Sequence, residues 1–144
     1  VDSPLALLHG QEQKLAEARQ AMAGLIAELR EEYPDALICQ NRGFEIIEIT
    51  GQNIDLLLVE SVYSTFNAQA EDYVLVSEMD RGWLLDRIAE ARDKAPHVKV
   101  LALDYASDAS GHLATGGRNF AGQHNMIHFV SNYDLQSIYN PGTL

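Results

Sequence analysis

The chain alternates between amphipathic segments and short runs that are mostly apolar. From Gln11 to Pro34, apolar residues recur every three or four positions among charged ones, which predicts an amphipathic helix that Pro34 ends. Four apolar runs follow, each too short for a helix, at residues 36–39, 54–59, 98–103 and 126–130. Because most of their successive positions are apolar and do not alternate with polar ones, they predict parallel strands covered on both faces.

The segments between these runs predict further helices. Residues 44–49 favour a brief helix, and Ser77 with Asp80 resembles a capping box at the start of a helix that Pro96 ends. Residues 108–123 are glycine-rich and predict a weak helix, and the long stretch 61–77 is expected to carry a short one. The alternation predicts an α/β fold, either a doubly wound sheet or a (β/α) barrel.

Length favours part of a barrel over a whole one. An eight-stranded (β/α) barrel usually needs about 250 residues, whereas this chain has 144 residues and four predicted strands. Four strands supply half of such a barrel. We therefore expect residues 1–144 to be a single α/β unit.

Polar side chains follow every predicted strand. They are Gln40 and Asn41, then Glu60, then Asp104 and Tyr105, then Ser131 and Asn132. The carboxyl ends of parallel strands share one rim, and ligands of such folds bind there. We therefore expect these residues to converge on one pocket.

Glu60 is the strongest single candidate for a catalytic residue, because it directly follows the apolar run 54–59. Burial at such a strand end is expected to raise its pKa toward general-acid use. Asp104 occupies the same position on the next strand, and two such carboxylates suit a glycosidase. Alternatives stay open: a surface role for Glu60, a loop-orienting or sugar-binding role for Asp104, and a sugar-stacking or loop-anchoring role for Tyr63.

Charge and composition limit the classes of molecule that the chain is expected to bind. The chain has 10 Lys and Arg against 21 Asp and Glu, a formal net charge of −11, and no run of cations. This disfavours nucleic acid and anionic membranes and suits a neutral or cationic substrate. No apolar run approaches the ~20 residues of a membrane span. The single Cys39 and the scattered histidines form no metal-binding motif, so no metal or organic cofactor is expected.

Three segments, taken in order, resemble the endo-α-1,4-polygalactosaminidase-like proteins of glycoside hydrolase family 114. They read DALICQNRGFE at residues 35–45, IDLLLVESVY at 54–63 and VLALDY at 100–105. Residues 128–131 resemble the last strand of that family's barrel, and the likeness extends from about Ala21 to Asn132. The resemblance implies a TIM-barrel glycosidase that acts on galactosamine-containing polysaccharide and is exported, hence secreted or periplasmic.

The resemblance also assigns roles within this chain. Glu60 matches a catalytic glutamate of the family, and its partner is an aspartate on an earlier strand. Val1-Asp2-Ser3 resembles the end of that earlier segment, so the catalytic aspartate is expected upstream of Val1, with Asp2 close to the site. Substrate binding is then expected from the set Gln40, Asn41, Tyr63, Asp104, Tyr105 and Asp2.

The chain would therefore be the C-terminal half of a (β/α)8 barrel. A missing N-terminal half-barrel, or a second chain, would have to complete both the sheet and the two-carboxylate site. Two other hypotheses remain: a non-catalytic carbohydrate-binding or scaffold protein on the same fold, and a free-standing doubly wound domain whose sheet edges are shielded.

Overall fold

The structure is a computed structural model that describes residues 11–137; Asp2 lies outside this range. Its centre is a four-stranded parallel sheet in the order β1-β2-β5-β6. The strands are β1 (Cys39–Asn41), β2 (Leu56–Glu60), β5 (Lys99–Tyr105) and β6 (Ile127–Ser131). The helices are α1 (Glu12–Glu32), α2 (Ile47–Thr50), α3 (Glu78–Lys94) and α4 (His112–Gln123), with 3-10 turns η2 (Phe44–Ile46) and η3 (Gly51–Asn53) on either side of α2.

The predicted α/β alternation is confirmed, with shifts at the strand ends. β1 begins only at Cys39, so Gln40 and Asn41 lie within the strand instead of after it. β5 likewise continues through Asp104 to Tyr105. These strands pair with β2 through the backbone, and backbone pairing does not require apolar side chains. α3 begins as expected, because the Ser77 side chain accepts a hydrogen bond from the Asp80 amide.

The helices pack against one face of the sheet. Leu57 and Val59 of β2 share a buried cluster with Leu84 and Ile88 of α3. Side chains alternate between the faces of a strand, so Leu56, Leu58, Leu101 and Leu103 point to the opposite face, where all four are only half-buried. Within residues 11–137, this second face is not closed.

Residues 61–77 form a hairpin instead of the short helix that we expected. β3 (Ser64–Asn67) pairs antiparallel with β4 (Asp72–Leu75). Phe66 and Tyr73 lie opposite each other with ring centroids 5.2 Å apart, and such aromatic pairs stabilise hairpins. The Asn67 side chain accepts hydrogen bonds from the amides of Gln69 and Ala70 and so closes the turn.

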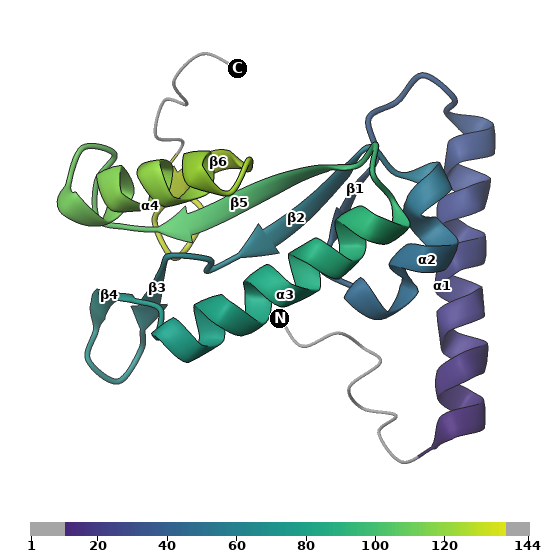
Figure 1. Cartoon of the computed structure of the whole chain (residues 1–144), viewed down its shortest axis with the longest axis horizontal. Helices are drawn as coiled ribbons and strands as arrows, with labels where there is room; N and C mark the ends of the chain where they lie inside the picture. Colours follow the sequence, from purple (N-terminus) through teal and green to yellow (C-terminus); the bar gives the residue numbers. More distant parts are fainter. Residues whose placement is uncertain (1–10, 138–144) are drawn as a thin grey trace.

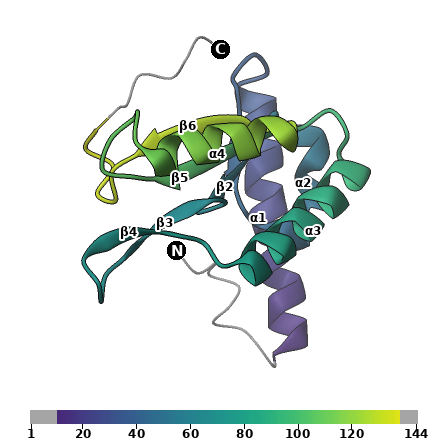
Figure 2. The ribbon, with the colours of Figure 1, turned by 60° about the vertical axis from the view of Figure 1, so that its left-hand side comes forward.

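The arrangement in space is that of βα units from a barrel. α3 and α4 run alongside the sheet, and the hairpin projects beyond the carboxyl ends of the strands (Figures 1 and 2). A doubly wound sheet would carry helices on both faces, whereas the helices described between residues 11 and 137 cover one face. No helix in the described part of the chain is long and apolar enough to cross a membrane.

Candidate functional site

Glu60 ends β2 and faces the open side of the sheet, between residues of the two neighbouring strands. Its Oε1 accepts a hydrogen bond of 2.6 Å from the Asn41 amide on β1. Its Oε2 accepts one of 2.5 Å from the Tyr105 hydroxyl on β5. The structure thus brings together three of the predicted site residues at the carboxyl edge of the sheet.

These contacts reverse the pKa shift that we expected for Glu60. Partial burial acts to raise the pKa, but the hydrogen bonds from Tyr105 and Asn41 and the nearby charge of Arg42 outweigh it. The pKa of Glu60 therefore lies below its ordinary value, and the carboxylate is held ionised. The prediction of a raised pKa is wrong because burial was considered without the donors. Burial and the bond to Glu60 raise the pKa of Tyr105, so its hydroxyl stays protonated as a donor.

Arg42 is a site residue that our sequence reasoning missed. Its guanidinium donates a 2.8 Å hydrogen bond to the Glu60 carbonyl. Arg42 and Gly43 both have positive φ, 49° and 64°, which turns the chain back after β1. The only sequence signal was its place directly after the polar pair that ends β1.

Gln40 faces the helices rather than the open side, and it is buried. Its amide donates to the carbonyls of Arg42 and Gly43 at 2.9 and 3.1 Å. Its oxygen accepts from the Thr50 hydroxyl at 2.7 Å. In place of the expected sugar contact, Gln40 holds the turn that carries Arg42.

Asp104 also faces the helices, and its side chain is 1% exposed. One carboxylate oxygen accepts from the backbone amides of Tyr63 and Ser64 at 2.7 and 3.1 Å, and the other lies 2.9 Å from His128 Nε2. Glu60 is paired in register with Leu103, so Asp104 points to the opposite face of the sheet. The structure therefore favours the loop-orienting role for Asp104, and it does not form the Glu60–Asp104 pair.

Tyr63 anchors the segment that follows Glu60. Its ring contacts Phe120 of α4 at 5.6 Å between centroids, and the Arg81 guanidinium lies 5.5 Å from the ring. The ring sits so close to α4 that a Cβ at Gly116 would come within 2.5 Å of the tyrosine oxygen. This packing matches the loop-anchoring alternative rather than sugar stacking.

The chemistry available at this edge is therefore that of one ionised carboxylate with fixed donors. Among residues 11–137, no group of three or more His, Cys, Asp or Glu side chains is arranged to hold a metal ion. Asp2 belongs to the expected site but lies outside the described residues. A Glu60 carboxylate beside Asn41 and Tyr105 can accept a proton, attack an electrophilic carbon or stabilise positive charge.

Comparison with known proteins bears on the fold. No family model and no curated protein matches the sequence. Among solved structures, the glycoside hydrolase domain of PelA from Pseudomonas aeruginosa aligns with a TM-score of 0.71 and 26% identity, over 90% of this chain and 51% of that one. A Glu-to-Ala variant of the same domain aligns with a TM-score of 0.70 and 25% identity, over the same shares.

The fold is thus that of part of a TIM-barrel glycoside hydrolase domain, and the resemblance to family 114 is confirmed. The chain spans about half the length of the PelA domain that it matches.

Proposed function

We propose that this chain is one half of the barrel domain of a glycoside hydrolase that cleaves α-1,4-linked galactosamine-containing polysaccharide. Glu60 serves as one of the two catalytic carboxylates. The observation that carries the proposal is the position of Glu60: an ionised carboxylate at the carboxyl edge of a parallel sheet, held by Asn41 and Tyr105. Active sites of barrel enzymes lie at this edge.

The lowered pKa of Glu60, together with its two fixed donors, favours one of two parts in the reaction. A two-carboxylate glycosidase needs one protonated acid for the leaving oxygen and one carboxylate that acts as base or nucleophile. Glu60 fits the second role, because its pKa is lowered. The proton donor is then the other carboxylate, expected upstream of Val1. Of the described site residues, Asp104 cannot take that part, since it is buried on the far face of β5.

The active molecule also needs a second half-barrel. Leu56, Leu58, Leu101 and Leu103 line the open face of the sheet and are only partly buried. α1 leaves Leu25 and Leu29 exposed by 62% and 48%. Apolar surface of this kind is stabilised by burial. Further βα units, from the rest of the polypeptide or from another chain, would close the barrel and bring the second carboxylate to Glu60.

The net charge of the chain suits the proposed substrate. The net charge of −11 attracts a polymer with free amines. Extracellular polysaccharide is reached by an exported enzyme, so we infer secretion or a periplasmic location.

A carbohydrate-binding protein without turnover is the second candidate, and one observation favours it: among the described residues, Glu60 has no catalytic carboxylate partner on the open face.

The decisive experiment compares Glu60→Gln with Glu28→Gln, a matched change at an exposed position of α1. The protein is purified under non-denaturing conditions, so that whatever completes the barrel is retained, and the release of reducing ends from an α-1,4-galactosamine polymer is measured. We expect Glu60→Gln to lower kcat by about 100-fold or more and Glu28→Gln to leave it unchanged. Equal activity in the two variants would remove Glu60 from the mechanism, and polymer binding without hydrolysis would favour the second candidate.

A further inference from the structure

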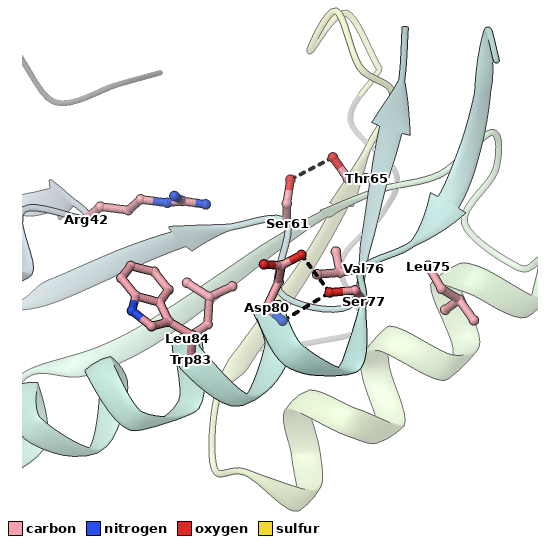
Figure 3. A pocket seen from close by; sticks show the side chains of 9 residues that line it. All are labelled: Arg42, Ser61, Thr65, Leu75, Val76, Ser77, Asp80, Trp83 and Leu84. Carbon is pink, nitrogen blue, oxygen red and sulfur yellow. Dashed lines mark hydrogen bonds between the residues drawn. The ribbon is translucent and has the colours of Figure 1, made fainter. Parts of the chain in front are cut away.

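A cavity of about 390 Å³ lies beside the end of β2, apart from the side chain of Glu60. It is formed by the turn after β1, the hairpin β3–β4 and the first turns of α3 (Figure 3). Its polar and aromatic lining consists of Arg42, Ser61, Thr65, Ser77, Asp80 and Trp83. Its volume falls within the range of small-molecule sites, about 300–1,000 Å³.

The polar groups of this cavity are held in place by bonds to one another and to the backbone. The Ser61 hydroxyl donates to Thr65 Oγ1 at 3.0 Å, and the Ser77 hydroxyl donates to the Asp80 carboxylate at 2.6 Å. Arg42 is fixed by its bond to the Glu60 carbonyl. Hydroxyl, carboxylate and guanidinium groups each retain further hydrogen-bonding capacity after one such bond. The cavity thus presents fixed donors and acceptors to a ligand.

Trp83 supplies an exposed aromatic surface at one end of the cavity. The residue is 53% exposed, and its ring meets Phe44 edge to face at 6.4 Å between centroids. In Figure 3, Arg42 and Trp83 lie at the left of the view, Ser61 and Asp80 lie near its centre, and Thr65 and Ser77 lie to their right. An indole beside hydroxyls and charges offers a flat apolar face together with polar contacts, which suits a pyranose ring.

The charges in the cavity limit the ligand class. Arg42 contributes one positive charge and Asp80 one negative charge, so they balance. Asp80 and Glu78 also stand in the first turn of α3, which disfavours a phosphate or another anion there. A neutral polyhydroxylated ring fits, as does one that carries a single amine opposite Asp80.

The cavity is connected to the Glu60 site through the backbone. Ser61 directly follows Glu60, and its φ of 54° is in the left-handed region, as is that of Arg42. Such values in residues other than glycine are strained. The two strained turns carry the chain from the open face, where the Glu60 carboxylate lies, to the wall of the cavity.

We propose that this cavity is an additional sugar-binding subsite, which holds a pyranose unit of the polysaccharide near the bond that Glu60 acts on. The sugar ring stacks on Trp83. Its hydroxyls bind Ser61, Thr65 and Arg42, and its amine binds Asp80. The identity of the sugar rests on the proposed function, whereas the site itself rests on the geometry of the cavity.

Trp83 makes the proposal directly testable, because it is the only tryptophan in the chain. A short α-1,4-linked galactosamine oligomer is titrated into the full chain in the Glu60→Gln background, and tryptophan emission is recorded. We expect a saturable change in emission, which weakens when the oligomer is N-acetylated or when Asp80 is replaced by Asn. Emission that does not respond to the oligomer at any concentration would overturn the proposal.

Polymer kinetics give the second measurement. Trp83→Ala should raise KM for long polymer about tenfold, the range of one good aromatic contact, and leave kcat nearly unchanged. Trp83→Tyr keeps an aromatic face and should retain most of the affinity. Met79→Ala is the matched control, because Met79 is 81% exposed on the same helix and does not line the cavity. Equal KM values for Trp83→Ala and Met79→Ala, in variants with unchanged circular dichroism, would refute the subsite.

The two proposals fail in different ways. If Glu60-dependent hydrolysis is found but neither emission nor KM depends on Trp83, the subsite is wrong and the hydrolase stands. If the oligomer changes Trp83 emission in a protein that never hydrolyses it, the subsite stands and the hydrolase proposal fails.

Discussion

At the scale of single residues, the protonation state of Glu60 is set by two neighbours on different strands. Partial burial of a carboxylate raises its pKa, and here the donors Tyr105 and Asn41 more than offset that effect. Tyr105 is suited to this task, because burial and the contact with Glu60 raise its own pKa and keep its proton in place. The pair therefore keeps the Glu60 carboxylate ionised in mildly acidic solution.

Tyr105→Phe tests this assignment. The change removes a hydrogen bond to the charged form of Glu60, so the pKa of Glu60 should rise. If Glu60 works as a carboxylate, activity is lost as pH falls through that pKa, and in the variant the loss should begin at a higher pH. A pH–rate profile of kcat/KM measures the shift, with Tyr33→Phe, an exposed site beyond α1, as control. If the acid limb of the kcat/KM profile lies at the same pH in Tyr105→Phe as in the unchanged protein, the role of Tyr105 is contradicted.

At the scale of elements, the sequence predicted features that depend on a local pattern, such as the start of α3. It did not predict features that depend on contacts between strands, such as the hairpin β3–β4. The capping pair Ser77 and Asp80 marked the start of α3 correctly, since a helix cap lies within one turn. The hairpin β3–β4 was missed because its stabilising contact, Phe66 against Tyr73, crosses between strands. Polarity in sequence also does not reveal which face a strand residue occupies, and so Asn41 and Gln40 were predicted to act alike.

The close contact between α4 and the sheet depends on glycine. A Cβ at Gly117 would lie 2.7 Å from His128 Nε2 and 2.9 Å from the Asp104 carboxylate, both in a buried pair. Gly117→Ala should therefore destabilise the fold by about 1–3 kcal/mol, the range for overpacking. A Cβ at Gly122 in the same helix would have no atom within 4 Å. Gly122→Ala should therefore stabilise the fold by about 0.5–1 kcal/mol. Urea unfolding of both variants measures the difference, and effects of the same sign would contradict the contact.

At the scale of the whole molecule, the sheet is asymmetric. Within residues 11–137, helices cover one face, which holds the core, while the other carries leucines that are only partly buried. In a doubly wound protein both faces would be covered, whereas in a barrel the second face is filled by side chains from the remaining strands. The match to about half of the PelA glycoside hydrolase domain agrees with the barrel. We therefore expect the open face to be buried in the active protein.

Leu57 and Leu58 allow a direct test of that expectation, because they are neighbours on β2 that point to opposite faces. Leu57 is 0% exposed in the core, so Leu57→Ala should lower the free energy of unfolding by about 2–5 kcal/mol in any form of the protein. Leu58→Ala should have a comparable effect only where a second half-barrel closes the sheet, and a much smaller one in the isolated 144-residue chain. Urea unfolding of both forms, with intact mass and oligomeric state measured in parallel, gives the comparison. A small effect of Leu58→Ala in the active form would mean that this face stays open to solvent, and that the second carboxylate does not arrive by barrel closure.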